Sequence, residues 1–187
     1  MSQLTKRAIE ASFIKLLNEK PFDKITVKDI VEECGINRNT FYYHFQDIYD
    51  LLSQLFDAEA NKILSSEMTV VSLEDSIVEA TQFVLQNKRA IYHIYRSINR
   101  ESLYLYLCKT VGAIFSKFVR AQAEGLTVSD VDFRIIISMA KYAIVGAVFE
   151  WLENDMKDDA AAIIHRIIYL ANGEIRRMLE NAAENQT

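Results

Sequence analysis

The sequence predicts an all-α protein of about nine helices, in which a group of three N-terminal helices precedes a larger helical region. Helix breakers are scarce, because the 187 residues include five glycines and one proline. Apolar residues recur at intervals of three and four over long stretches, as they do on one face of a helix. Residues whose side chains cap helix N-termini precede several of these stretches, namely Thr26, Asn37 and Asp47.

The first four helices are expected at about residues 5–19, 27–33, 38–45 and 48–63. One apolar stripe marks the first of them and consists of Ile9, Phe13, Leu16 and Leu17. Pro21 ends that helix, because proline lacks the amide hydrogen that an interior helical position donates. Thr26 followed by Asp29 predicts a capping box for the second helix. Gly35 predicts a turn with positive φ before the third.

Five further helices are expected at about residues 72–86, 89–95, 103–118, 129–154 and 158–183. Ser72 is the predicted start of the first of these, and Gly125 lies in a predicted turn. The last two helices are the most apolar, and the first of that pair is apolar around much of its circumference. Since one chain has few other surfaces to cover them, the simplest interpretation is a homodimer formed through helices 129–154 and 158–183.

Residues 26–45, TVKDIVEECGINRNTFYYHF, have the pattern of a helix-turn-helix. This motif needs two short helices, a small residue in the turn, and apolar side chains that hold the helices together. Gly35 fits the turn, and the apolar contacts are expected from Ile30, Val31, Ile36 and Phe41. The rest of the second helix is polar or aromatic: Arg38, Asn39, Thr40, Tyr42, Tyr43 and His44. Packing alone does not require so many polar groups, so this helix is predicted to read DNA.

The predicted DNA contacts divide into two classes. Contacts with base edges are expected from Arg38, Asn39 and Tyr43, since arginine and asparagine match the hydrogen-bonding pattern of the major groove. Contacts with the phosphate backbone are expected from Thr40, Tyr42 and His44, and from Thr26 and Lys28 at the start of the preceding helix. Two plainer interpretations stay open, namely a surface helix that is polar by chance and a structural role for His44.

The N-terminal 56 or so residues resemble the TetR (tetracycline repressor) family of bacterial regulators. The segments TKRAIEASFIKLL, ITVKDIVEECGI and NTFYYHF carry this resemblance. It implies a DNA-binding domain at residues 1–46 and an effector-binding and dimerisation domain at residues 47–187. It also implies a homodimer whose last two helices form a four-helix bundle, and a pocket for a small-molecule inducer that releases the DNA.

The effector itself is not identified by the sequence. Six aromatic side chains in the second domain are candidates to line its pocket: Phe83, Tyr92, Tyr95, Tyr104, Tyr142 and Phe149. Packing in the core explains each of them equally well. No metal or other cofactor is expected, because His93, His165 and the two cysteines have no ligand spacing.

Charge and apolar runs limit the other functional classes. The net charge is −5, and residues 1–46 hold seven Lys and Arg against six Asp and Glu, so no strong basic footprint exists. The unpaired Cys34 and Cys108 and the absence of a signal-peptide pattern predict a reduced, cytoplasmic protein. The longest apolar run, Tyr142–Phe149, is shorter than the roughly 20 residues of a membrane span.

These patterns together predict a ligand-responsive transcriptional regulator, a repressor released from a palindromic double-stranded DNA operator by a small-molecule inducer. One alternative is a DNA-binding activator or co-regulator that is controlled by a protein partner. Another is a small helical enzyme or ligand carrier. No nucleophile with a nearby base, metal cluster or phosphate-binding loop in the sequence favours an enzyme.

Overall fold

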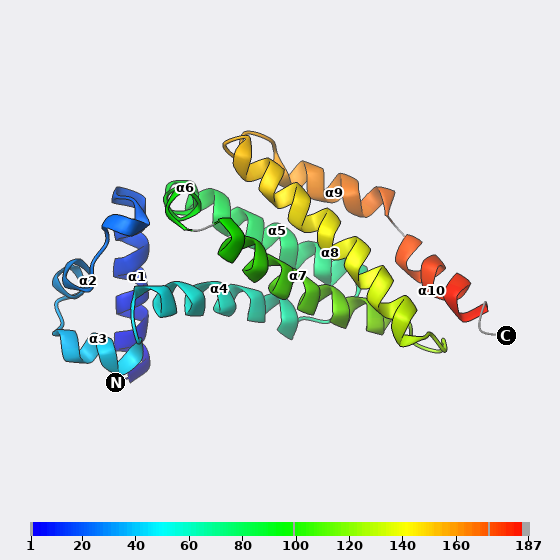
Figure 1. The fold of residues 1–187 in the computed structure, drawn as a ribbon, viewed down its shortest axis with the longest axis horizontal. Coiled ribbons are helices and arrows are strands. Elements are labelled where there is room, and N and C mark those ends of the chain that lie inside the picture. The colour runs from blue at the N-terminus through cyan, green and yellow to red at the C-terminus, as the bar shows by residue number, and fades with distance from the viewer. Residues whose placement is uncertain (1, 99, 172, 185–187) are drawn as a thin grey trace. The chain divides into compact units, whose positions relative to one another are not determined.

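A computed structural model describes residues 2–98, 100–171 and 173–184, which contain helices and no strand. The elements are α1 (Ser2–Glu19), η1 (Phe22–Lys24), α2 (Val27–Cys34), α3 (Arg38–His44), α4 (Ile48–Ser65), α5 (Val70–Gln86), α6 (Lys88–Ser97), α7 (Arg100–Gln122), α8 (Asp130–Glu153), α9 (Ala160–Leu170) and α10 (Glu174–Glu184). Figure 1 shows their succession along the chain. The predicted all-α class is confirmed.

The chain divides into two compact units. The first contains residues 1–59 and 83–100, and the second contains residues 60–82 and 101–187. Both α4 and α5 therefore contribute residues to each unit. This division by packing differs from the functional domains expected at residues 1–46 and 47–187, and those domains stay a prediction.

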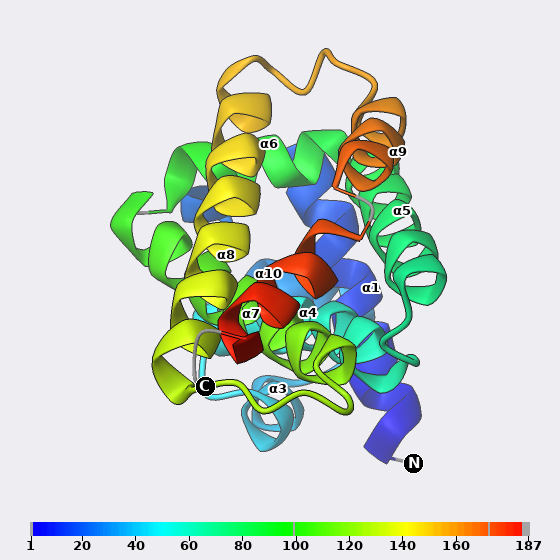
Figure 2. The ribbon, with the colours of Figure 1, turned by 90° about the vertical axis from the view of Figure 1, so that its right-hand side faces the viewer.

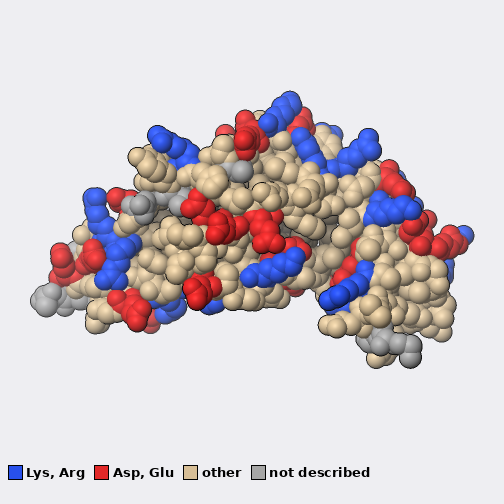
Figure 3. Space-filling model, turned by 180° about the vertical axis from the view of Figure 1, so that it is seen from behind, with Lys and Arg blue, Asp and Glu red and all other residues tan. Residues whose placement is uncertain are grey.

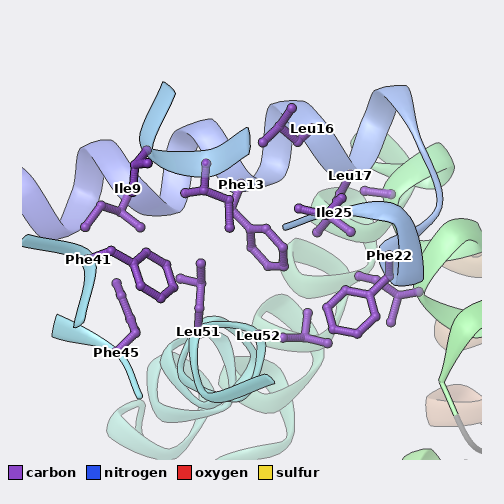
Figure 4. Packing of buried hydrophobic residues seen from close by; sticks show 14 residues of the cluster. Ile9, Phe13, Leu16, Leu17, Phe22, Ile25, Phe41, Phe45, Leu51 and Leu52 are labelled. Carbon is purple, nitrogen blue, oxygen red and sulfur yellow. The ribbon is translucent and has the colours of Figure 1, made fainter. Parts of the chain in front are cut away.

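The first unit is built around a core that joins α1, α3, α4 and α6. Phe13 and Phe41 are completely buried, and Figure 4 shows their rings beside Leu51 of α4. Ala90 and Ile94 of α6 belong to the same cluster. Replacing a buried phenylalanine with alanine typically costs about 3–5 kcal/mol, so this core fixes α3 firmly against its neighbours.

The second unit has its own core, to which α4, α5, α7, α8 and α10 contribute. Val119 and Leu179 are completely buried there. Polar contacts also join the helices: Arg176 of α10 donates hydrogen bonds of 2.8 and 3.0 Å to the carbonyl oxygens of Gln122 and Glu124, where α7 ends. A guanidinium at this position satisfies the carbonyl of the last residue of α7 and one in the turn that follows it.

The expectation of one last helix over residues 158–183 is wrong. The structure has two helices there, α9 and α10, and Figures 1 and 2 show them as separate rods. Gly173 lies between them with a φ of 80°, a left-handed conformation that ends an α-helix. The described residues therefore contain ten α-helices rather than about nine.

Some helix starts also differ from the expectation: α1 begins at Ser2 rather than near residue 5, and α7 at Arg100 rather than near residue 103. The helix expected from Ser72 begins at Val70, because Thr69 caps it. The Thr69 hydroxyl accepts a hydrogen bond of 3.1 Å from the backbone N–H of Ser72. The predicted caps at Thr26, Asn37 and Asp47 are confirmed, as is the predicted turn at Gly125, which has a φ of 80°.

Within the described ranges, α8 alone has the length and apolar composition of a membrane-spanning helix. This is weak support for a membrane role, because a core helix of a soluble protein has the same properties. Lys141 lies near its middle, and one long face of α8 is exposed in the single chain. The exposed apolar side chains on it include Val131, Ile135, Met139 and Tyr142.

Candidate DNA-reading site

The turn that precedes the reading helix is fixed from both sides. The Thr26 hydroxyl accepts a hydrogen bond of 3.2 Å from the N–H of Asp29, and the Asp29 carboxylate accepts one of 2.8 Å from the N–H of Thr26. This is the predicted capping box of α2. Gly35 ends α2 with a φ of 70°, and the N–H of Ile36 then bonds to the carbonyl of Val31 at 3.0 Å. The chain thereby turns into α3.

Helix α3 presents its polar residues outward because its apolar residue faces the core. Asn37 caps it by accepting a hydrogen bond of 2.8 Å from the N–H of Thr40. Phe41 is completely buried, whereas Tyr42 is 55% and Tyr43 is 78% exposed. Arg38 and Asn39 in its first turn are exposed as well. These four side chains are thus accessible to an extended ligand such as a DNA duplex.

The remaining predicted contacts are partly engaged within the protein. The hydroxyl of Thr40 donates to Asn37 at 3.0 Å, and the hydroxyl of Thr26 donates to Asp29 at 2.7 Å. Lys28 lies 3.7 Å from Glu32, and His44 is half-buried with its ring 5.1 Å edge-on from that of Tyr43. Either threonine hydroxyl would have to rotate away from its present acceptor to donate to a phosphate.

Acidic side chains pair with the lysines around this site. Lys15 lies 2.6 Å from Glu33, and this carboxylate raises the pKa of Lys15. Lys20 lies 3.0 Å from Asp29, whose pKa falls to about 2, first because the Thr26 hydroxyl donates to it and then because Lys20 does. Figure 3 likewise shows basic and acidic side chains interspersed on the face in view. Phosphates would have to compete with these surface pairs, which are individually weak.

The six predicted effector contacts fall into two groups. Phe83, Tyr92 and Tyr95 belong to the first compact unit, and Tyr104, Tyr142 and Phe149 belong to the second. Tyr92 accepts a hydrogen bond from Arg96. The rings of Tyr104 and Phe149 are 6.1 Å apart, and a hydrogen bond with Cys108 raises the pKa of Tyr104. Their role in binding an effector stays a prediction.

An open groove of about 440 Å³ runs along α8 and includes one of those six residues, Tyr142. The groove is lined by Val131, Arg134, Ile135, Ser138, Met139 and Tyr142. All six come from one face of one helix, so the groove is a surface feature. Among the residues that the structure describes, no group of three His, Cys, Asp or Glu could hold a metal ion.

Several residues that support the reading helix were not singled out in the sequence. Lys6 and Gln54 are joined by a hydrogen bond of 2.7 Å, and Asp50 accepts from Gln54. The spacing of Asp47 and Asp50 is a readable capping signal. Lys6 and Gln54 are 48 positions apart in the chain, so their contact produces no local pattern in the sequence.

The fold and this site define a class of protein: a transcriptional regulator in which a capped helix-turn-helix precedes a larger helical region along the chain. The chain belongs to the TetR family. The family described as "Bacterial regulatory proteins, tetR family" matches residues 12–55, and that described as "Transcriptional regulator C-terminal region" matches residues 72–173, more than half of the chain. The predicted family is confirmed, and both descriptions are of regulators.

Two curated relatives match parts of the sequence. The HTH-type dhaKLM operon transcriptional activator DhaS of Lactococcus lactis is 24% identical over 87 residues, 46% of either chain. An uncharacterized HTH-type transcriptional regulator of Haemophilus influenzae is 35% identical over 65 residues, 34% of this chain and 31% of the relative. The matched stretches thus span less than half of either relative.

Solved structures share the fold over most of the chain. The dihydroxyacetone kinase operon activator DhaS has a TM-score of 0.75 at 19% identity and is matched over 92% of this chain and 96% of its own. NalD, the secondary repressor of the MexAB-OprM multidrug efflux pump in Pseudomonas aeruginosa, has a TM-score of 0.56 at 19% identity, over 90% of this chain and 96% of its own. At these identities the likeness concerns the fold alone.

Proposed function

We propose that this protein is a cytoplasmic, homodimeric repressor that binds a palindromic DNA operator through α3 and leaves it when a small molecule binds. The observation that carries the proposal is the outward face of α3, where Arg38, Asn39, Tyr42 and Tyr43 are exposed while Phe41 anchors the helix. In this arrangement Arg38 and Asn39 address base edges from the first turn of the helix. Tyr43 joins them, and Tyr42, Thr40 and His44 set the register on the backbone.

The dimer is proposed to form through α8 and α9. Val131, Ile135, Met139 and Tyr142 are each more than half exposed on α8, and Ile163, Ile167, Tyr169 and Leu170 are exposed on α9. The four α8 side chains lie together on one face of that helix, and a contiguous exposed apolar patch is unusual on a monomer. By contrast, α10 buries Leu179 completely in its own chain, so the second interface helix is α9 rather than all of residues 158–183.

Two copies of α3 held by such a dimer would meet successive major grooves, about 34 Å apart. An effector that binds the DNA-incompetent arrangement more tightly shifts the population away from that spacing. The candidate effector contacts remain Phe83, Tyr92, Tyr95, Tyr104 and Phe149. We assign Tyr142 to the dimer interface first, because it is 53% exposed on the same face as Met139.

An activator is a second candidate. It is favoured by the similarity to DhaS, an operon activator that resembles this chain in both sequence and structure. The two candidates differ in the sign of their effect on transcription. Transcription in vitro from a promoter that carries the selected operator decides between them, because a repressor lowers the amount of transcript and an activator raises it.

The DNA-reading role is tested by selecting duplexes from a random pool and replacing single side chains. Arg38→Ala is expected to weaken the selected duplex by about 1–3 kcal/mol and a shuffled duplex much less, because a base contact is lost. Lys28→Ala is expected to weaken both equally and to lower the slope of log affinity against log salt by about 1.

Arg177→Ala provides the matched control, since Arg177 is an exposed arginine on α10. It should change neither affinity. Equal binding of the selected duplex by the wild type and the Arg38→Ala variant would disprove the assigned docking.

A further inference from the structure

A chain of hydrogen bonds links α1 to α4 and then to the turn between α3 and α4. Lys6 of α1 donates to the side-chain oxygen of Gln54 at 2.7 Å. The Gln54 amide nitrogen donates to one oxygen of Asp50 at 3.0 Å. The other Asp50 oxygen accepts the backbone N–H of Gln46 at 2.8 Å. We call Lys6, Gln54, Asp50 and Gln46 the Lys6–Gln46 relay.

Only one orientation of the central amide fits this relay. The ammonium of Lys6 only donates, so it must face the oxygen of Gln54. The carboxylate of Asp50 only accepts, so it must face the nitrogen of Gln54. Gln54 is therefore a neutral bridge between a cation and an anion, and both of its polar atoms make a hydrogen bond to a charged group.

The charges of the relay are used inside the protein. Hydrogen bonds from Gln54 and from the N–H of Gln46 lower the pKa of Asp50, and Lys6 adds to this effect. Lys6 also lies 5.5 Å from the centre of the Phe45 ring, within the range of a cation–π contact. Its ammonium is thus held over the residue that ends α3.

The relay holds the segment that determines where α3 ends. Phe45 is buried and Gln46 is bound to Asp50, while the N–H of Asp50 donates to Asp47 at 2.8 Å. Helix α3 has seven residues, so a displacement of this turn would carry Tyr43 and His44 with it. The N-terminal end of α3 is held separately, by the Asn37 cap.

We infer that Gln54 is a positioning residue for DNA reading, which aligns the C-terminal end of α3 through Asp50 and the turn at Gln46. This inference rests on the proposed DNA-reading role of α3. Gln54 itself touches no DNA in this scheme. Lys6, although basic and close to the reading helix, serves the relay rather than a phosphate.

The test replaces Gln54 with methionine, which has a similar length and makes neither hydrogen bond. The ratio of affinities for the selected and the shuffled duplex is expected to fall about fivefold to tenfold, the effect of one or two lost hydrogen bonds. Affinity for the shuffled duplex should stay the same. The backbone N–H of Gln46 should exchange its hydrogen with solvent faster than in the wild type. Gln86→Met, at an exposed glutamine on α5, is the control and should leave all three quantities unchanged.

A second pair of variants separates the relay from a direct phosphate contact and remains informative if Gln54→Met unfolds. Lys6→Met should lower the ratio of affinities for the selected and shuffled duplexes as Gln54→Met does, without changing the slope of log affinity against log salt. Lys6→Arg should keep the wild-type ratio, because a guanidinium also donates to Gln54. A salt slope lowered by about 1 in Lys6→Met would instead reveal a phosphate contact and overturn the inference.

Faster Gln46 exchange in Gln54→Met with an unchanged affinity ratio would also overturn the inference. If the wild type selects no duplex at all, the proposed function fails first and the DNA role of the relay falls with it. Exchange at Gln46 would then still report whether the hydrogen bonds exist.

Discussion

His93 of α6 places its Nδ1 atom 2.7 Å from the carbonyl oxygen of Leu17 in the last turn of α1. The last four carbonyls of a helix have no partner within it, and that of Leu17 is one of them, since α1 ends at Glu19. A carbonyl oxygen only accepts, so Nδ1 of His93 carries the proton. This hydrogen bond adds to the apolar core that α6 shares with α1, the helix on which the DNA-reading unit is built.

Replacing His93 with alanine should therefore weaken the first unit. Loss of the hydrogen bond is expected to lower the free energy of unfolding by about 1 kcal/mol, measured by urea denaturation. His165→Ala is the control, because His165 is exposed and its partner Glu74 forms a surface pair with it. The control should cost less than about 0.5 kcal/mol. Equal losses in the two variants would contradict the role assigned to His93.

Gly35→Ala should destabilise the turn between α2 and α3. Open space surrounds the position, so the expected loss of about 1–2 kcal/mol comes from the left-handed φ of 70° alone. Gly35→Asn should cost less, since asparagine tolerates this conformation. Thermal unfolding measures the loss of stability in each of the two variants.

Gly125→Ala is the matched control for that substitution. Gly125 also has a positive φ and open space around it, but it lies outside the DNA-reading unit. We expect a similar loss of stability from Gly125→Ala and unchanged affinity for the selected duplex, whereas Gly35→Ala lowers both. Reduced DNA affinity in both variants would mean that general destabilisation accounts for the effect.

The capping box of α2 should make stability depend on pH in the acid range. The pKa of Asp29 is about 2 in the folded protein against 3.8 in a model peptide, so its contribution is complete above the higher value and is lost as the pH falls toward the lower one. Nuclear magnetic resonance titration of the Asp29 carboxyl measures the folded value directly.

Two substitutions accompany that titration. Thr26→Ala should cost about 1 kcal/mol of stability at neutral pH and should return the Asp29 pKa toward its ordinary value, because the largest cause of the shift is removed. Lys20→Met removes the second cause and should raise the pKa less. A larger rise in Lys20→Met than in Thr26→Ala would show that the ion pair, rather than the cap, dominates.

Met139→Glu should separate the proposed dimer into monomers. A carboxylate placed in the middle of the exposed apolar face of α8 would lose its hydration when a second copy packs there. Sedimentation velocity measures the oligomeric state. Leu4→Glu is the control, since Leu4 is 74% exposed on α1 in the first compact unit, whereas α8 and α9 belong to the second. A wild-type protein that sediments as a monomer would disprove the dimer outright.

Local features of this fold are predictable from the sequence because their causes lie within a few residues. The caps at Thr26, Asn37 and Asp47 depend on a side chain and a backbone N–H three positions later. The turn at Gly35 depends on one residue type. The outward face of α3 follows from its period, once Phe41 is assigned to the core.

The features that were missed depend on a distant partner, on a single backbone angle or on a choice between two neighbouring capping residues. The apolar pattern of residues 158–183 continues across the break at Gly173, so periodicity alone cannot locate that break. Ser72 competes with Thr69 as a cap, and both are good capping residues. The contact of His93 with Leu17 spans 76 positions and exists only after the chain has folded.

The open surface of α9 has a consequence for the amount of protein that a cell must make. An isolated helix of eleven residues is marginal in water, and few described side chains of α9 other than Ala160 are buried in their own chain. If a second copy covers this helix, the stability of α9 depends on the protein concentration, because dimerisation favours the ordered helix. At low copy number α9 would then fray and be exposed to proteases, so that scarce protein is removed and abundant protein persists.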